Sequence, residues 1–309
     1  MTGRLMLLDT ASLYFRAFYG VPDTVKAPDG TPVNAVRGLL DIIARLVADF
    51  EPTELVACWD VDWRPRWRVE LIPSYKAHRV AELVPGGSDV EQTPEALVVQ
   101  IPVIRQALDA LGIAIVGAAD YEADDVIGTL ATGAATLVDI VTGDRDLFQL
   151  VDDDAGVRVI YTAKGMSQLE LITDDVIESK YGIVPAQYAA FATMRGDSSD
   201  GLPGVPGVGE KTAAGLLREF GDLDGILEAA EDPETPMSST VRARFAAASD
   251  YLAVAPRVVA VARDLDLPSF DPAIGPLAGD RLAAALELAD TWGLGGSMQR
   301  VLKALGTEV

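Results

Sequence analysis

Short apolar runs alternate with helical patterns over the first two-thirds of the chain. The apolar runs are continuous rather than alternating, which is typical of strands that are buried on both faces of a parallel sheet. They occupy residues 5–8, 55–59, 113–116, 137–141 and 157–161. Between them, a stretch such as 34–50 carries apolar residues at three- and four-residue spacing, which is the pattern of an amphipathic helix. This alternation predicts an α/β domain with a mainly parallel sheet and helices on both faces.

The pattern that follows Thr93 predicts one long helix over residues 94–111. Thr93 is a candidate N-cap, Pro94 suits the first helical position, and Gly112 follows the last turn. Pro102 falls inside this pattern, where a proline removes a backbone hydrogen bond, so we expect a kink there.

Two regions depart from the strand–helix alternation. Residues 62–89 are polar, irregular and rich in basic side chains, and they are too many for an ordinary connection, so this segment is either a functional excursion or disordered. From about residue 172 helical patterns take over, at 174–181, 185–194, 209–219, 223–230 and 280–289. We therefore predict an α/β domain over residues 1–172, with the excursion at about 62–92, and a mainly helical region over 173–309.

Composition narrows the class of protein. The length of 309 residues fits about two domains, and 49% hydrophobic residues suffice for a core. Cys58 is the single cysteine, which excludes an internal disulfide and indicates a reducing cytoplasm. No apolar run reaches the ~18 residues of a membrane helix. The formal net charge of −22, taken alone, argues against a nucleic-acid partner.

Acidic residues stand where predicted strands end. Asp9, Asp60 and Asp144 each follow an apolar run, and the carboxyl ends of parallel strands border the ligand crevice of an open α/β sheet. Further acids occur in tight groups, namely Glu122, Asp124 and Asp125, then Asp146 beside Asp144, and Asp197 with Asp200. Each group also has a plain structural explanation, because acids favour the first turn of a helix and serve as N-caps after turns.

The combination of acids is harder to explain structurally than any one group. Two carboxylates 5 Å apart repel by ~3 kcal/mol at an effective dielectric constant of 20, so six or more in one crevice require protons or cations. Oxygen ligands select hard ions such as Mg²⁺ or Mn²⁺, and one cysteine with one histidine is too few for a usual zinc site. An acid-lined crevice of this kind suggests two-metal phosphoryl chemistry.

A glycine-rich loop, residues 204–209, precedes a helical pattern. Its glycines permit a tight turn, and the backbone N–H groups of Gly207, Gly209 and the helix start are able to face a phosphate, with Lys211 adding positive charge. A purely structural turn explains the loop equally well. The spacing is not that of a Walker motif and no strand precedes it, so we do not predict a nucleotide triphosphate site. Backbone contacts of this type hold nucleic acid without reading its sequence.

Several motifs occur together in one order along residues 5–227. They are Leu8-Asp9 with Arg16-Ala17-Phe18, Pro73-Ser74-Tyr75-Lys76-x-x-Arg79, Tyr121-Glu122-Ala123-Asp124-Asp125, Thr142-Gly143-Asp144-x-Asp146-Leu147 and Gly196-Asp197-Ser198-Ser199-Asp200 leading into the glycine-rich loop. In these motifs the chain resembles the bacterial 5′ nuclease (flap endonuclease) family, which is related to the 5′-nuclease domain of family A DNA polymerases.

The resemblance implies a PIN-like α/β domain, a helical arch and a helix–three-turn–helix at about residues 186–222. It implies one metal ion held by Asp9, Asp60, Glu122 and Asp124, and a second held by Asp124, Asp144, Asp146 and Asp200. Asp125 and Asp197 match the family's remaining acids, which leaves a third ion open. The ions would be Mg²⁺ or Mn²⁺.

The resemblance also implies how DNA is held. Lys76 and Arg79 match arch residues that engage the scissile phosphate, and Tyr75 matches a base-stacking neighbour. Val205 and Val208 match positions whose carbonyls bind K⁺ beside the DNA backbone. Other expected contacts come from the loop and from nearby basic residues, namely Gly207, Gly209, Lys211, Thr212, Arg16 and Arg37.

The implied activity is cleavage of DNA at 5′ ends and 5′ flaps, giving 5′-phosphate and 3′-hydroxyl products by a two-metal mechanism, in replication and repair. The expected partner is branched or nicked DNA, with RNA-containing strands left open, and the expected protein is a monomer at the nucleoid. Thr10 replaces the family's usual glycine after Asp9, but none of the implied metal ligands is missing. A DNA-binding protein that does not cut and a PIN-type ribonuclease remain the alternatives.

Overall fold

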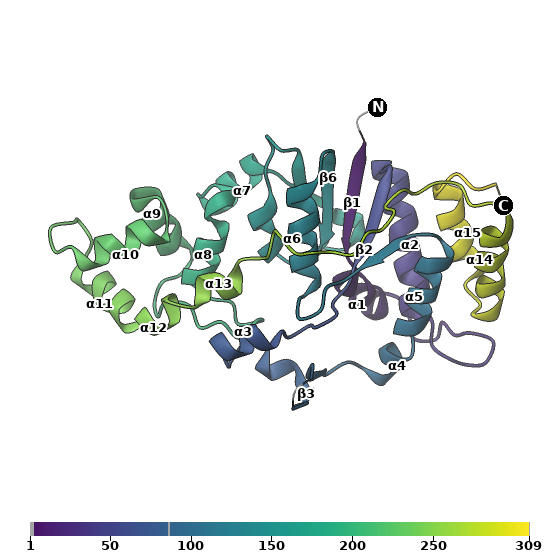
Figure 1. Cartoon of the computed structure of the whole chain (residues 1–309), viewed down its shortest axis with the longest axis horizontal. Helices are drawn as coiled ribbons and strands as arrows, with labels where there is room; N and C mark the ends of the chain where they lie inside the picture. The colour runs from purple at the N-terminus through teal and green to yellow at the C-terminus, as the bar shows by residue number, and fades with distance from the viewer. Residues whose placement is uncertain (1–2, 86, 309) are drawn as a thin grey trace.

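A six-stranded sheet forms the centre of the molecule in the computed structural model, which describes residues 3–85 and 87–308 (Figure 1). The strand order is β5-β2-β1-β6-β7-β8. The strands are β1 (Arg4–Asp9), β2 (Glu54–Cys58), β5 (Ala114–Val116), β6 (Leu137–Thr142), β7 (Val157–Tyr161) and β8 (Glu170–Ile172). The first five are mutually parallel, and β8 pairs with β7 in the antiparallel sense. The predicted parallel sheet is confirmed, whereas β8 was not predicted.

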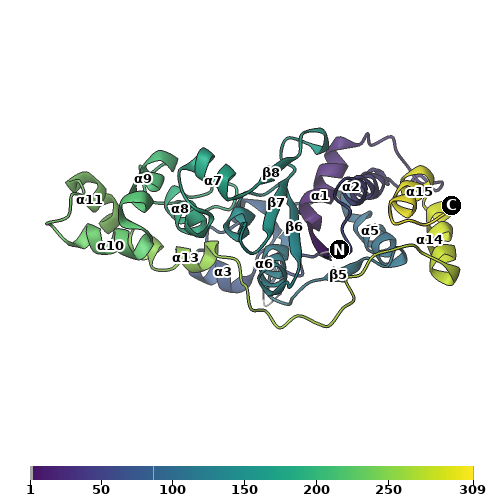
Figure 2. The ribbon, with the colours of Figure 1, turned by 90° about the horizontal axis from the view of Figure 1, so that it is seen from above.

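Both faces of the sheet are covered by helices, as the continuous apolar strands require. Leu7 on β1 packs in one core with α6 (Ala123–Gly133), and Met6 on the same strand packs in a second core with α2 (Asn34–Phe50). This split follows from the two-residue period of a strand. Seen from above, α6 lies on one side of the sheet, and α1 (Thr10–Gly20), α2 and α5 (Ile101–Ala110) lie on the other (Figure 2).

The prediction of a single kinked helix over residues 94–111 is wrong. The segment forms a short α4 (Glu95–Val98) and a separate α5, so Pro102 lies in the first turn of α5, where its missing N–H costs nothing. The proposed N-cap also moves, because Pro94 rather than Thr93 precedes α4. The break brings Gln100 toward the start of α2, where its Oε1 accepts the Ala35 N–H at 2.8 Å.

The basic excursion, residues 62–92, is folded, but it contains less helix than the helical arch that the resemblance implied. It contains α3 (Arg66–Leu71), a 3-10 turn η1 (Ala77–Arg79) and a small hairpin of β3 (Val80–Glu82) with β4 (Val90–Glu91). Arg64 is buried inside it, where Nε donates to the Tyr75 carbonyl at 2.6 Å and Nη1 pairs with Asp89. The segment crosses below the carboxyl ends of the strands (Figure 1).

A lobe of short helices extends from one side of the sheet. Its elements and those leading to it are η2 (Asp146–Leu150), η3 (Met166–Gln168), α7 (Asp174–Tyr181), η4 (Pro185–Gln187), α8 (Tyr188–Arg195), α9 (Glu210–Phe220), α10 (Leu223–Glu231), α11 (Ser239–Ala247), α12 (Ser249–Leu252) and α13 (Ala255–Val259). The predicted helices between residues 174 and 230 all appear here, within one or two residues at most boundaries. The fold class, a PIN-like sheet domain with a helical C-terminal part, is confirmed.

The last two helices do not belong to that lobe, contrary to the predicted boundary at residue 173. After α13 the chain crosses back past β2, where the Leu55 N–H donates to the Pro272 carbonyl at 2.8 Å. Helices α14 (Gly279–Thr291) and α15 (Gly295–Ala304) then pack on the α/β domain, where Met298 and Leu302 join the core that contains α2. They lie at the opposite end of the molecule from α9–α12 (Figure 2). Among the described residues, no helix has the length and apolarity needed to cross a membrane.

Candidate active site

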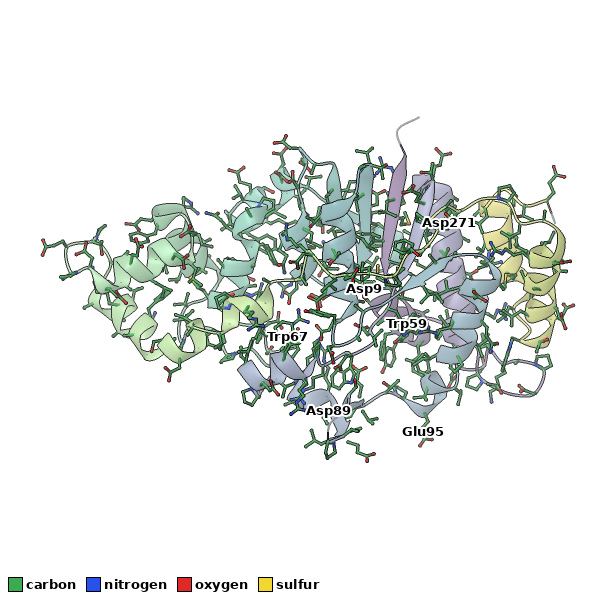
Figure 3. All side chains as sticks on the ribbon, in the orientation of Figure 1. Asp9, Trp59, Trp67, Asp89, Glu95 and Asp271 are labelled. Carbon is green, nitrogen blue, oxygen red and sulfur yellow. The ribbon has the colours of Figure 1, made fainter. Side chains whose placement is uncertain are left out.

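A crevice of about 380 Å³ opens at the carboxyl ends of the strands, and five of the predicted acids line it together. β1 ends at Asp9, which directly caps α1 by accepting the Ser12 N–H at 3.2 Å, so the turn from strand to helix fixes its carboxylate. In Figure 3, Asp9 lies at the lower end of the sheet, above the excursion that carries Asp89. The five acids are Asp9, Asp60, Glu122, Asp124 and Asp144.

Thr142 links two of these acids and was not singled out by sequence reasoning. Its hydroxyl donates to Asp9 Oδ2 at 2.6 Å and accepts the Asp144 N–H at 2.8 Å. One buried hydroxyl at the end of β6 therefore sets the spacing between acids that come from neighbouring strands. Its position just before Gly143-Asp144 was the available signal. Glu91 of the excursion also lines the crevice and was likewise missed.

Three of the other predicted acids, Asp146, Asp197 and Asp200, lie near Asp144. The charges of Asp197 and Asp200 both act on Asp144 and Asp146, and a buried Oδ1 of Asp146 has no hydrogen-bond partner. The Asp197 carboxylate accepts hydrogen bonds from the Ser199 N–H at 2.8 Å and from Arg195 Nη2 at 3.2 Å. The acids thus form two adjoining groups that share Asp144.

Burial among like charges perturbs these carboxyl groups. Desolvation, aided by the charge of Asp60, raises the pKa of Asp9 to about 7 against the opposing hydrogen bond from Thr142. Burial raises the pKa of Asp124 and of Asp146 well above the usual value, and neighbouring carboxylates act in the same direction. A cation would relieve this repulsion, and an oxygen-only donor set with an unpartnered buried carboxylate oxygen suits a hard divalent ion.

The side chains as they stand do not close around an ion. Over the described residues, no three Asp, Glu, His or Cys side chains are arranged to hold a metal. Lys76 explains part of this, because its Nζ lies 2.7 Å from Glu122 Oε1 inside the crevice. Metal binding would therefore require side-chain adjustment, with Lys76 leaving Glu122.

Asp125 is a correction to the predicted set of metal ligands. Both of its oxygens are engaged by Arg68, at 2.8 Å from Nη1 and 2.8 Å from Nη2, and they also accept the N–H groups of Glu122 and Ala262. Asp125 is fully buried and does not line the crevice. Its sequence motif could not reveal this, because Asp124 and Asp125 differ only in the side of the helix start that they face.

Tyr75 is a second correction, whereas Lys76 and Arg79 both line the crevice. The Tyr75 ring is buried and its hydroxyl donates to Glu122 Oε2 at 2.8 Å, so the ring is not available to stack on a base. Lys76 and Arg79 line the crevice, and Arg79 Nη2 reaches the Asp200 carboxylate at 3.2 Å. The excursion therefore delivers two cationic groups to the acids.

The tryptophans of this region anchor the base of the excursion. Trp63 Nε1 donates to the Asp89 carbonyl at 2.7 Å, and Trp67 Nε1 donates to the Asp120 carbonyl at 3.1 Å. The Arg105 guanidinium lies over the Trp59 ring, with its Cζ atom 4.7 Å from the ring centroid. The contact between Trp67 and Asp120 holds the excursion against the α/β domain, whereas the contact between Trp63 and Asp89 lies within the excursion.

The glycine-rich loop, residues 204–209, lies between α8 and α9. Gly207 has a φ of 75°, a left-handed conformation that favours glycine, and its carbonyl accepts Arg244 Nη1 at 2.9 Å. Gly209 is the N-cap of α9 with no side-chain cap, Lys211 is exposed, and Thr212 follows in the first turn. Val205 and Val208 are buried, and the Val205 carbonyl accepts the Val208 N–H at 2.9 Å.

The remaining predicted basic residues lie on the first two helices. Arg16, on α1, is half-buried, and its guanidinium is close to Gly143, which precedes Asp144. Arg37, on α2, does not line the crevice. The structure thus brings Arg16 to the border of the acid cluster and leaves Arg37 apart from it.

Comparison with known proteins identifies the family. Residues 4–182 match the model of the 5′-3′ exonuclease N-terminal resolvase-like domain, and residues 183–273 match the model of the 5′-3′ exonuclease C-terminal SAM fold. The chain belongs to the 5′-3′ exonuclease family. It is a nuclease, and the resemblance inferred from its motifs is confirmed.

Relatives of this 5′-3′ exonuclease extend over its whole length. A 5′-3′ exonuclease of Streptomyces coelicolor is 64% identical over 97% of this chain and 99% of its own. A 5′-3′ exonuclease of Mycobacterium tuberculosis is 49% identical over 99% of both chains. The DNA polymerase I of Mycobacterium bovis is 42% identical over 78% of this chain and 26% of the polymerase.

Solved structures share the fold of the exonuclease at low identity. T5 5′-exonuclease with bound zinc has a TM-score of 0.63 at 17% identity and covers 98% of this chain and 99% of its own. Human GEN1 in complex with Holliday junction DNA has a TM-score of 0.63 at 16% identity, over 98% of this chain and 72% of its own. At these identities the likeness establishes the fold alone.

Proposed function

We propose that this 5′-3′ exonuclease is a divalent-metal-dependent, structure-specific nuclease that cuts DNA at 5′ ends and 5′ flaps. The observation that carries the proposal is the crevice, where Asp9, Asp60, Glu122, Asp124 and Asp144 meet two cationic groups of the excursion. Such a cluster of carboxylates is stable at neutral pH only with protons or cations. The zinc ions named with T5 5′-exonuclease, which shares this fold, support the same reading.

The acids divide into two ligand groups in this proposal. Asp9, Asp60, Glu122 and Asp124 would hold one ion, and Asp124, Asp144, Asp146 and Asp200 the other, with Asp197 available to a third. Mg²⁺ or Mn²⁺ fits these oxygen donors. When bound, such ions acidify water and stabilise charge on the phosphodiester oxygens. Asp125 is left out because Arg68 and two backbone N–H groups engage both of its oxygens.

The chain's own cations complete the proposed chemistry. Lys76 and Arg79 stand at the crevice on the excursion, where they would neutralise charge that builds on the phosphoryl oxygens. When a cation binds the Glu122 carboxylate, it would displace Lys76 Nζ from that carboxylate. The Lys76 ammonium group would then bind a phosphate of the DNA. An excursion of this size, lying across the acids, would favour single-stranded 5′ ends over intact duplex.

DNA would be held by local positive groups despite the net charge of −22. We assign the duplex to the α8–α9 element, through the N–H groups of Gly207 and Gly209, Lys211 and Thr212, with K⁺ at the carbonyls of Val205 and Val208. Arg16 would contact the strand near the crevice, and Arg37 is a more distant candidate. A structure of related fold, the catalytic core of Rad2 in complex with DNA substrate, supports DNA as the substrate. In this proposal the protein acts as a monomer. RNA-containing flaps are a second substrate to test.

End-labelled DNA with a 5′ flap tests the proposal. The protein should cut it near the branch in Mg²⁺ or Mn²⁺ and leave it intact in EDTA, with a 3′-hydroxyl on the released flap and a 5′-phosphate on the strand that remains in the duplex. Asp144→Asn should abolish cleavage while flap binding survives. Cleavage that persists in EDTA, or full activity of Asp144→Asn, would contradict the metal assignment.

A further inference from the structure

Arg68 is a buried cation at the base of the excursion that the proposed chemistry does not use. It lies on α3, is 2% exposed, and is the largest fully buried side chain among the described residues. A buried guanidinium is costly unless it is paired and fully hydrogen-bonded. Its partners therefore indicate what the position requires.

Arg68 donates hydrogen bonds to two other parts of the molecule, the start of α6 and helix α13. Its Nη1 and Nη2 form a two-point pair with Asp125, each at 2.8 Å. Nη1 also donates to Glu122 Oε2 at 3.1 Å, and Nε donates to the Val258 carbonyl at 3.1 Å. The planar fork of arginine matches this set of acceptors, which a lysine cannot satisfy.

Asp125 extends the same network. Besides Arg68, its oxygens accept the Glu122 N–H at 3.2 Å and the Ala262 N–H at 2.9 Å. Val258 lies on α13, the last helix of the lobe, and Ala262 lies in the segment that returns from it. The Arg68–Asp125 pair thus joins the excursion, the start of α6 and the return segment at one buried point behind Glu122.

The two oxygens of Glu122 have different sets of partners, although the Tyr75 hydroxyl contacts both of them, at 2.8 Å from Oε2 and at 3.1 Å from Oε1. Oε2 accepts from Arg68 and, at 2.8 Å, from the Tyr75 hydroxyl. Oε1 accepts from Lys76, which lines the crevice, at 2.7 Å. Arg68 therefore contacts only Oε2, Lys76 contacts only Oε1, and the Tyr75 hydroxyl lies nearer to Oε2 than to Oε1.

We propose that Arg68 is a positioning residue that, paired with Asp125, fixes Glu122 Oε2 so that Oε1 is presented to a divalent cation in the crevice. The proposal rests on the proposed function, since it assigns Glu122 as a ligand. Hydrogen-bonding partners of a ligating carboxylate change metal affinity by about 10–100-fold when they are removed. A purely structural Arg68 would instead change stability alone.

Mn²⁺ binding to the full-length protein separates the two roles. Free Mn²⁺ is counted by electron paramagnetic resonance during titration of wild type, Arg68→Lys and Asp125→Asn, with thermal unfolding measured on the same samples. Arg158→Gln is the matched control, because Arg158 pairs with buried Asp139 on the sheet, away from the crevice. We expect affinity for the tighter Mn²⁺ to fall about 10–100-fold in both test variants and to be unchanged in the control.

Affinity equal to or tighter than wild type in folded Arg68→Lys or Asp125→Asn would overturn the inference. If neither variant folds, Tyr75→Phe decides, since it removes only a neutral donor whose shorter contact is to Oε2. It should weaken Mn²⁺ binding measurably, and unchanged binding would reject the positioning of Oε2. Failure of the proposed function looks different, because wild type would then bind no Mn²⁺ and would not cut a flap in Mg²⁺.

Discussion

Asp124 and Asp125 are adjacent in the chain, yet they have opposite roles in the structure. Asp124 lines the crevice, while Asp125 accepts hydrogen bonds from Arg68 and from the Ala262 N–H of the return segment. The sequence motif identifies both acids as special but does not say which way each one faces. That choice depends on contacts with residues more than 50 positions away, which no local pattern contains. Tyr75 was mispredicted for the same reason.

Lys76→Ala should slow cleavage more than it weakens DNA binding. Lys76 stands in the crevice at 2.7 Å from Glu122, where its charge is placed to act on the reacting phosphate. Removal of one such group costs about 10²–10³-fold in rate. Single-turnover cleavage in Mg²⁺ gives the rate, and fluorescence anisotropy in Ca²⁺ gives the affinity. Equal losses in both would contradict a role in the transition state.

Cation binding should depend on pH through Asp9. Burial raises the pKa of Asp9 from 3.8 to about 7, so the metal-free folded protein holds a proton that the unfolded chain releases across this window. This group therefore makes the metal-free protein less stable as pH rises through that window. A cation needs the ionised form, so its affinity should fall by about tenfold per pH unit below the pKa.

The consequence is measurable as a change in Tm. At one fixed Mg²⁺ concentration, the rise in Tm over the EDTA sample should be larger at about pH 8 than at about pH 6. Asp9→Asn removes the titrating group and should give a small rise at both pH values. A larger effect of Mg²⁺ at the lower pH would contradict the assignment of Asp9.

At the level of elements, the strands and several helices were predictable because their patterns are local. The range 34–50 predicted for α2 agrees with the structure, and 174–181 agrees with α7. The excursion was not predictable in detail. Its shape depends on buried Arg64, on tryptophan contacts and on the loop that contains Gly201, all of which involve distant backbone groups.

Gly201→Ala should displace the excursion. Gly201 has a left-handed φ of 69°, and a β-carbon there would collide with the Ser74 carbonyl oxygen, two residues before Lys76. The Lys76 N–H also donates to the Asp200 carbonyl at 2.9 Å, so Lys76 would move with the loop. We expect a loss of about 1–3 kcal/mol in unfolding free energy and a slower cleavage rate.

Gly306→Ala is the control for this variant. Gly306 has a φ of 82° but no atom within 4 Å of the β-carbon position, and it lies beyond α15. Urea unfolding should show a smaller loss than for Gly201→Ala, and the cleavage rate should not change. Equal effects of the two substitutions on cleavage would show that contact between the loop and the excursion is unimportant.

At the level of the whole molecule, the prediction failed where distant segments come together. The helical pattern at 280–289 predicted α14, and α15 was not predicted. Nothing local shows that these helices cover α2 and α5 rather than the helical lobe. The gathering of the acids was predictable for a different reason, because the ends of parallel strands must share one edge of the sheet. Topology, rather than residue type, explains both outcomes.

Leu302→Ala should destabilise the α/β domain. Leu302 on α15 is fully buried in the core that contains α2, and truncation of such a leucine costs about 2–5 kcal/mol. Leu286→Ala on α14 is the control, because this side chain is exposed and should cost about 0.5 kcal/mol. Urea unfolding followed by tryptophan fluorescence measures both. Similar small losses would mean that α15 is not part of the core.

Crystals soaked in Mn²⁺ give the most direct test of the central claim, that the acids gather in the crevice to hold divalent cations. Anomalous scattering locates the ions without reference to any assay. The account predicts peaks among Asp9, Asp60, Glu122, Asp124 and Asp144, with Lys76 withdrawn from Glu122 and with Arg68 still paired to Asp125. A saturated crystal with no Mn²⁺ in the crevice, or with Mn²⁺ held only elsewhere, would contradict it.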